Sequence, residues 1–341
     1  MSITSRDIAK AVGVSQSTVS RALRSDPRVA EETRQRVVEA AQRLAYTPNL
    51  MARNLITNRT QTVGVVVSDI TNPFYPELLD VLHSELSLLG YRTVLFNERT
   101  DERGAEEMLG QLAARAVDGM VFASATLGSH SADIFSRRGL PVVLLNRYVD
   151  GARVDRVIAD NRGGGELAGR FIVELGHRRI ALIAGPENTS TSRDREAGLR
   201  AALEGLDVPL DDRLRRTGTY SHQSGYQACM ELMTGDDPPT AIICGNDVIA
   251  FGALDAAHRL QRHIPEDVSI IGYDDIEMAN WEVFNLTTIR QPLARMAKVA
   301  VGMLAERVEG HRAGEPREVV FPSQLVKRET AGPVPDRAGA R

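Results

Sequence analysis

Cysteine is scarce in this chain of 341 residues, which has only Cys229 and Cys244. Two cysteines form neither a disulfide framework nor a metal-ligand cluster, so we expect both to be small core residues. Long apolar runs are also missing, since no stretch approaches the roughly 20 residues that span a bilayer. The first residues, MSITSRDIAK, lack the basic segment and apolar run of a signal peptide. We therefore expect a cytoplasmic protein with no membrane partner.

Motifs for catalysis and cofactor binding are absent as well. The sequence has no G-x-S-x-G nucleophile elbow, no H-E-x-x-H and no P-loop, and its seven histidines lack metal-ligand spacing. The glycines of DNRGGGELAG, residues 160–169, do not follow the G-x-G-x-x-G pattern of a dinucleotide site, and close helix packing accounts for them better. We expect no enzymatic activity, no cofactor and no metal.

Positive charge is unevenly distributed along the chain. Residues 1–60 contain ten Lys or Arg and five acidic residues, for a net charge of +5, whereas the remainder carries −9. Basic segments attached to acidic bodies commonly bind phosphate groups. The length also exceeds that of a typical single core, so the chain is expected to contain two or three folding units.

The basic segment has the pattern of three short helices. The first begins near Thr4, with Asp7 placed as in a capping box, and ends at Gly13. The second is capped by Ser15 and separates an apolar face from a polar one, which consists of Gln16, Ser17, Ser20, Arg21 and Arg24. The third covers about residues 31–45 and turns Val37, Val38, Ala41 and Leu44 inward.

Two short helices joined at a glycine and braced by a third predict a helix-turn-helix domain over residues 1–46. In such a domain the second helix enters the DNA major groove, where short polar side chains and arginine read base edges. A helical cap with a solvated polar face is the alternative, and the net charge of +5 argues against it.

From Thr62 onward, buried runs of strand length alternate with amphipathic helical segments. The runs include VGVVVSD (63–69), RTVLFN (92–97), DGMVFAS (118–124) and PVVLLN (141–146), and a second series continues to DVSIIGYDD (267–275). This pattern predicts α/β halves with parallel, doubly wound sheets. LTTIRQP (286–292) and EVVFPSQLVKRE (318–329) indicate that the chain crosses between the halves more than once.

Polar and aromatic residues follow many of these strands. Ligands of open α/β sheets bind beyond the carboxyl ends of the strands, which makes these residues candidates for a binding site. Helix capping is an equally good explanation for three of them: Asn72, Asn246 and Asp247. For Arg195 and Asp274 the alternative is a structural ion pair, and for Trp281 it is a place in the core. Asp, Asn and Arg bind neighbouring hydroxyl groups, and an aromatic ring covers an apolar ring face, so the combination suits a sugar or polyol.

The segment from ITSRDIAKAVGVSQSTVSRAL to VGVVVSDITNPFY resembles, without gaps, the amino-terminal third of the LacI/GalR (lactose repressor/galactose repressor) family. The resemblance implies that Gln16, Ser17 and Arg21 contact bases and that Ser15, Thr18 and Ser20 contact phosphates. It also implies a body of the two-lobed periplasmic-binding-protein type. Ala30 departs from the family pattern, in which Ser or Thr often caps the third helix, so we expect this helix to lack a side-chain cap or to use Glu32 instead.

Residues 47–60, TPNLMARNLITNRT, include a helix of about seven residues that is not stable alone in water. A fraying linker is the simple interpretation. The family resemblance instead implies a hinge helix that orders on DNA and inserts Leu55 between base pairs in the minor groove, with Ala52 and Arg53 beside it.

Matched to the family pattern, seven body residues line the effector cleft: Phe74, Asn146, Thr191, Arg195, Tyr220, Asn246 and Asp274. A purine is the main alternative to a sugar effector, but Thr189 stands where an arginine helps to hold the base in purine-responsive relatives. The tail, residues 330–341, lacks leucine heptads and is expected to be disordered, so a dimer is favoured over a tetramer.

The sequence thus predicts a ligand-responsive transcription regulator, most simply a repressor, that binds a palindromic DNA operator as a homodimer. The effector domain covers residues 61–329, with one lobe at about 61–159 plus 290–320 and the other at about 160–289 plus 321–329. A solute-binding protein of a transporter is the alternative, and the basic amino-terminal segment argues against it.

Overall fold

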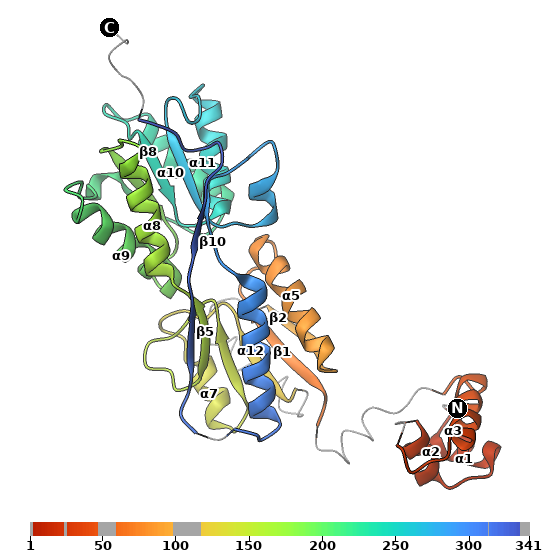
Figure 1. The fold of residues 1–341 in the computed structure, drawn as a ribbon. Coiled ribbons are helices and arrows are strands. Elements are labelled where there is room, and N and C mark those ends of the chain that lie inside the picture. The colour runs from red at the N-terminus through yellow and green to blue at the C-terminus, as the bar shows by residue number, and fades with distance from the viewer. Residues whose placement is uncertain (1–2, 24–25, 47–58, 98–116, 313, 335–341) are drawn as a thin grey trace. The chain divides into compact units, whose positions relative to one another are not determined.

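The computed structural model describes residues 3–23, 26–46, 59–97, 117–312 and 314–334. The chain divides into two compact units, Met1–Thr60 and Gln61–Arg341, which we call the head and the body (Figure 1). Each has a hydrophobic core of its own.

The described part of the head contains the helices α1 (Ser5–Val12), α2 (Gln16–Ala22) and α3 (Glu31–Arg43). Thr4 and Asp7 form the predicted capping box of α1, and α1 ends at Gly13 with a left-handed φ of 74°. The Ser15 side chain caps α2 by accepting a hydrogen bond from the Thr18 backbone N–H. As expected from Ala30, α3 has no side-chain cap, and Glu31 and Glu32 lie in its first turn, near the positive end of the helix dipole.

One half of the body, the N-lobe, is built on a sheet with the strand order β11-β5-β4-β3-β1-β2. Neighbouring strands of this sheet pair in parallel in the described residues. Its elements are β1 (Thr62–Val67), α5 (Phe74–Leu88), β2 (Arg92–Asn97), β3 (Gly119–Phe122), α7 (Ser131–Arg137), β4 (Val142–Leu145), β5 (Asp155–Ala159), α12 (Leu293–Val308) and β11 (Glu318–Phe321). Strands β1, β3 and β4 are buried along their whole length, as their apolar runs predict.

The other half, the C-lobe, has the strand order β12-β10-β9-β8-β6-β7, and only the β10–β12 pair of this sheet is antiparallel. Its elements are α8 (Asn161–Glu174), β6 (Ile180–Ala184), α9 (Ser190–Glu204), η1 (Asp212–Leu214), β7 (Arg215–Thr217), α10 (His222–Met233), β8 (Ala241–Cys244), α11 (Asp247–Arg259), β9 (Ser269–Asp274), η2 (Glu277–Asn280), β10 (Thr288–Arg290) and β12 (Gln324–Val326). The body is therefore two lobes of parallel-dominated α/β structure.

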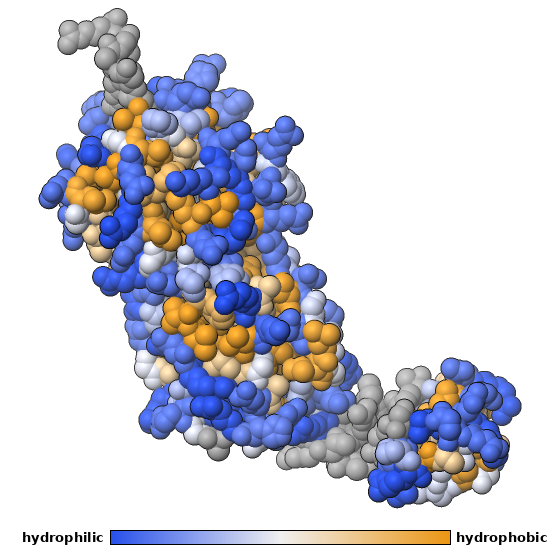
Figure 2. All heavy atoms as spheres, viewed as in Figure 1, coloured by the Kyte–Doolittle hydropathy of each residue, from blue (hydrophilic) through white to orange (hydrophobic). Residues whose placement is uncertain are grey.

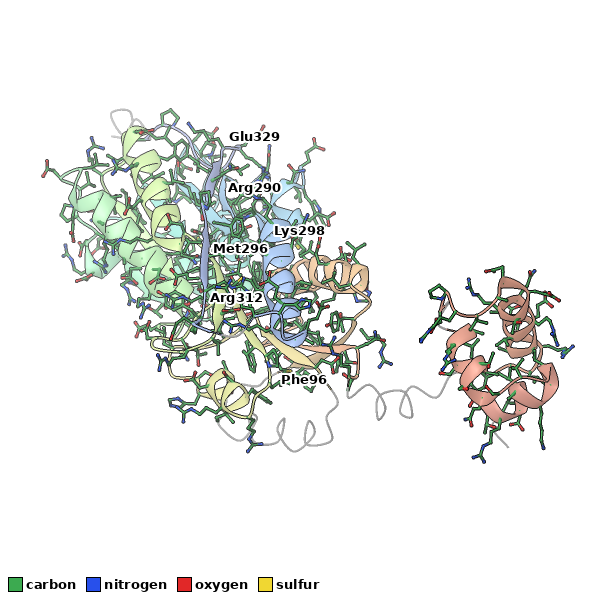
Figure 3. All side chains as sticks on the ribbon, turned by 60° about the horizontal axis from the view of Figure 1, so that its bottom comes forward. Phe96, Arg290, Met296, Lys298, Arg312 and Glu329 are labelled. Atoms are coloured by element: carbon green, nitrogen blue, oxygen red, sulfur yellow. The ribbon has the colours of Figure 1, made fainter. Side chains whose placement is uncertain are left out.

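The chain crosses between the lobes three times, after β5, after β10 and after β11 (Figure 1). Figure 3 labels residues on both sides of two of these crossings. Arg290 and Glu329 lie in the C-lobe. Met296 and Lys298 lie on α12 of the N-lobe, and Arg312 follows the end of that helix. The lobe boundaries differ slightly from expectation, because Arg290 pairs with Asp274 in the C-lobe sheet and Phe321 pairs with Ala159 in the N-lobe sheet.

The glycines of residues 160–169 allow α8 and α9 to pack closely. A Cβ on Gly165 would lie 2.1 Å from the backbone oxygen of Arg195. Close packing, the interpretation favoured over a nucleotide site, is therefore what these glycines provide, and it fixes the position of α9 against α8.

The start of the expected disordered tail is ordered, which corrects that prediction for residues 330–334. Thr330 is buried, donates its hydroxyl to the Ile270 carbonyl and accepts a hydrogen bond from the Thr287 N–H. The buried His177 ring lies 3.0 Å from the Gly332 carbonyl oxygen, and burial lowers the pKa of His177. Polar contacts that the composition does not reveal hold this segment on the C-lobe; residues 335–341 lie outside the described ranges.

Cys229 and Cys244 are both buried core residues, as predicted, and burial raises the pKa of the Cys229 thiol to about 12. Among the described helices, none combines the length and apolarity needed to cross a membrane.

Candidate functional site

A pocket lies between the lobes, at the carboxyl ends of their strands. Its volume is about 260 Å³. Ten residues line it: Asn72, Phe74, Tyr75, Asn146, Arg147, Thr191, Arg195, Tyr220, Asn246 and Asp274. The structure thus places all seven predicted effector residues around one cavity. Asn72, Tyr75 and Arg147 complete its wall.

The Arg195–Asp274 ion pair forms the polar centre of the pocket. The Arg195 Nη2 donates to Asp274 Oδ1 over 2.9 Å, and both side chains are more than nine-tenths buried. Burial raises the pKa of Asp274, although the nearby Arg195 opposes this shift. Burial by itself lowers the pKa of Arg195, but the Asp274 charge and the neighbouring tyrosines outweigh it, so the guanidinium stays charged.

Further contacts hold this pair in a single geometry. Arg195 also donates to Asn161 Oδ1 and to the Gly245 carbonyl oxygen, and its guanidinium lies 3.6 Å from the centroid of the Tyr273 ring. Gln291, on the second crossing segment, donates its amide to the same Asp274 oxygen over 2.8 Å.

On the N-lobe side, the neighbouring residues Asn146 and Arg147 leave polar atoms without partners. Both side chains are buried, and within the described part of the chain neither Asn146 Oδ1 nor Arg147 Nε has a hydrogen-bond partner. The Arg147 guanidinium lies 5.3 Å from the centroid of the Tyr220 ring, and the Tyr220 hydroxyl contacts Thr191 Oγ1. Unpaired polar atoms facing a cavity are costly unless a ligand binds them, so their presence marks a binding site.

Two pocket residues have a backbone conformation that is rare for residues other than glycine. Asn146 has a φ of 69° and Asp274 a φ of 113°. Such strain costs on the order of 1–3 kcal/mol and persists at functional sites where the surroundings enforce it. In both cases it turns a polar side chain at a strand end into the pocket.

Two asparagines of the pocket also bind the backbone at the start of a helix, and Asn246 is a true helix cap. Asn246 Oδ1 caps α11 by accepting from the Ile249 N–H, and Asn72 Oδ1 accepts from the Phe74 N–H. Both residues also line the pocket. Asp247, by contrast, does not line it: burial raises its pKa well above the usual value, and its carboxylate holds β10 and the residues after β9 through Thr288 and the Ile276 N–H.

Two further positions are settled by the structure. Trp281 belongs neither to the core nor to the pocket lining, because it is 48% exposed and stacks on Phe284. Thr189 is buried and caps α9 through Ser192 N–H, while its hydroxyl donates to the Pro186 carbonyl. It therefore does not reach the cavity.

In the head, α2 presents the predicted DNA-contacting residues to solvent. Gln16, Ser17, Ser20 and Arg21 are exposed, whereas Val19 and Ala22 are buried in the head core. Ser15 and Thr18 share a hydrogen bond at the start of the helix, and Gln16 Nε2 donates to Ser5 Oγ on α1 over 2.8 Å. The remaining predicted DNA contacts, Ala52, Arg53 and Leu55, lie outside the described residues.

A helix-turn-helix head joined to a two-lobed body with a pocket between the lobes defines a ligand-binding transcription regulator. Comparison with protein families supports this assignment. Residues 4–49 match the family described as bacterial regulatory proteins, lacI family, and residues 170–331 match the periplasmic binding protein-like domain.

Similar proteins extend the match to the whole chain. The HTH-type transcriptional repressor PurR of Erwinia tasmaniensis is 32% identical over 98% of both chains. Among solved structures, the complex of the transcriptional regulator CelR with cellobiose is 31% identical, with a TM-score of 0.75, and covers 96% of this chain and all of that one. The lac repressor dimer bound to operator and the anti-inducer ONPF is 28% identical, with a TM-score of 0.87, over 97% of this chain and all of that one.

The chain belongs to the LacI family of bacterial transcription regulators, as its amino-terminal sequence predicts. It is a ligand-responsive, DNA-binding repressor of that family. Its body has the fold of periplasmic binding proteins.

Proposed function

We propose that this repressor responds to a small carbohydrate or polyol bound between the lobes, and that it binds a near-palindromic operator as a homodimer in the cytoplasm. The observation that carries the proposal is the ring of polar groups around the pocket. Asn, Arg and Asp side chains offer donors and acceptors at several positions, which suits neighbouring hydroxyl groups. Phe74, Tyr75 and Tyr220 supply apolar ring faces.

A purine is the second candidate effector, because the PurR relative is 32% identical to this chain. The position of Thr189 argues against it. In purine-responsive members of the family an arginine at that position helps to hold the base, and here a buried threonine caps a helix instead. The CelR structure contains a sugar, cellobiose, at a similar level of identity.

Exposed apolar residues support a homodimer. Leu88 and Leu89 at the end of α5 are 80% and 52% exposed, and Val283, after η2, is 79% exposed. Figure 2 shows hydrophobic residues on the N-lobe surface over the end of α5. Apolar side chains that gather on a surface mark protein interfaces. Two heads in one dimer match the two half-sites of a palindromic operator.

The proposed mechanism is a coupling between the two units. The effector changes the closure of the lobes, closure shifts the dimer interface, and the interface stabilises or melts the hinge around Leu55. Such couplings are typically ~1–3 kcal/mol, which corresponds to about 5- to 150-fold in affinity.

A thermal-shift screen of the full chain against sugars, polyols and purines tests the effector class. A carbohydrate is expected to raise the melting temperature, because a ligand that binds only the folded state stabilises it by about 2.7 kcal/mol at 100 times its Kd. Stabilisation by purines alone would overturn the carbohydrate assignment.

A further inference from the structure

Direct contacts between the lobes border the pocket on the side of β4. Tyr148 and Asp150, in the loop after β4, meet Arg193 and Asp194 in the first turn of α9. The Tyr148 hydroxyl donates to Asp194 Oδ2 over 2.7 Å and accepts from Arg193 Nη2 over 2.7 Å. Arg193 also pairs with Asp150 over 2.6 Å. We call these four side chains the rim latch.

The rim latch is built on the same two segments as the pocket. Tyr148 directly follows Arg147, which lines the cavity, and Arg193 and Asp194 lie between Thr191 and Arg195, which also line it. The Tyr148 N–H donates to Ser190 Oγ, so backbone and side chains both join across the lobes. Any movement that separates the pocket walls here must also break the latch.

The latch is a charged cluster rather than a single contact. Hydrogen bonding to Arg193 lowers the pKa of Asp150, and hydrogen bonding to Asp150 raises the pKa of Arg193. The guanidinium of Arg193 lies 5.5 Å from the centroid of the Tyr148 ring, and that of Arg156 lies 4.8 Å from the same centroid. Polar contacts among four residues therefore hold the two lobes together at this rim.

Other bridges continue along the edge of the N-lobe sheet, where β4, β3 and β1 are neighbours. Beyond β3, the Leu127 N–H donates to the Asn188 carbonyl. Beyond β1, Asn72 Nδ2 donates to the Tyr220 carbonyl, and Glu77 Oε1 accepts from the Glu277 N–H. Contacts between the lobes thus extend from the end of β1 to the end of β4.

We propose that the rim latch stabilises the closed cleft without touching the effector, and that it thereby slows release of the effector. This inference rests on the carbohydrate effector proposed above. Tyr148 and Arg193 are positioning residues, because they act on the effector only through lobe closure. By linkage, an effector that closes the cleft strengthens the latch, and the latch strengthens effector binding by the same factor.

The test compares the full-length wild type with Tyr148→Phe, Arg193→Gln and the double variant. Tyr148→Phe removes the hydroxyl contacts and keeps the ring. The control is Arg200→Gln, which also removes ion pairs of α9, but its partners Glu196 and Asp212 lie within the C-lobe. The probes are glucose with cellobiose, galactose with lactose, and ribose, measured by thermal shift and by stopped-flow dissociation.

Exposed charge pairs contribute ~0.2–1 kcal/mol each, so loss of the latch should speed dissociation about 3- to 10-fold. The control variant Arg200→Gln should leave the dissociation rate unchanged.

A double variant with wild-type dissociation rates would overturn the role of the latch. If a purine base binds and no sugar does, the carbohydrate assignment is overturned. The role of the latch is then tested by measuring the same variants with that base and its nucleoside. Absence of stabilisation by every probe overturns both proposals.

Discussion

Asp274→Asn perturbs the centre of the pocket while leaving its shape almost unchanged. The substitution removes the negative charge that faces Arg195, a guanidinium that is 7% exposed. Breaking a buried ion pair from one side typically costs about 3–5 kcal/mol, because the other charge stays buried without its partner. Asparagine keeps an oxygen that can accept from Arg195 and Gln291, and Arg195 keeps the Gly245 carbonyl. We therefore expect a loss of about 2–3 kcal/mol in the free energy of unfolding.

The assay is thermal unfolding of the full chain with and without the effector found in the screen. For a body of this size the loss should lower the melting temperature by about 4–12 °C, and effector-induced stabilisation should disappear. The paired change Arg195→Met with Asp274→Leu separates the two effects: an apolar pair is expected to restore stability without restoring effector binding. The reasoning is refuted if Asp274→Asn melts like the wild type and still responds to the effector.

Two further predictions concern DNA. Arg21→Ala should relax base preference at one operator position by ~1–3 kcal/mol in a selection from random duplexes, and a uniform loss across all sequences would mean that Arg21 contacts only phosphate. Leu55→Ala should lower specific operator affinity and abolish bending while effector binding stays intact, because the wedge that unstacks a base step is gone; unchanged bending in a gel-shift assay would count against the hinge.

The fold was largely predictable, because its strongest signals are local. Buried strands of a parallel sheet are continuous apolar runs, and β1, β3 and β4 show them. The pocket residues were predictable by position, since ligands of such sheets bind beyond the carboxyl ends of the strands. Family resemblance then selected seven of them, and the structure places all seven around one cavity.

The remainder depends on tertiary contacts that no local pattern encodes. Arg147 was missed although it directly follows Asn146, because an arginine after a strand reads as a solvated residue until the opposite lobe covers it. Val38 was predicted to point inward but is 37% exposed, whereas Val37, Ala40 and Ala41 are the buried residues of α3. The rim latch joins residues 43 to 46 positions apart through side chains that each resemble ordinary surface charges.

The central claim is that a ligand in the body controls DNA binding by the head. The most direct test is fluorescence anisotropy of the full chain on an operator recovered by selection, titrated with and without the effector that stabilises the body. We predict a change of about 5- to 150-fold in operator affinity when the effector is present. An effector that binds the body at the pocket yet leaves operator affinity unchanged would contradict the account.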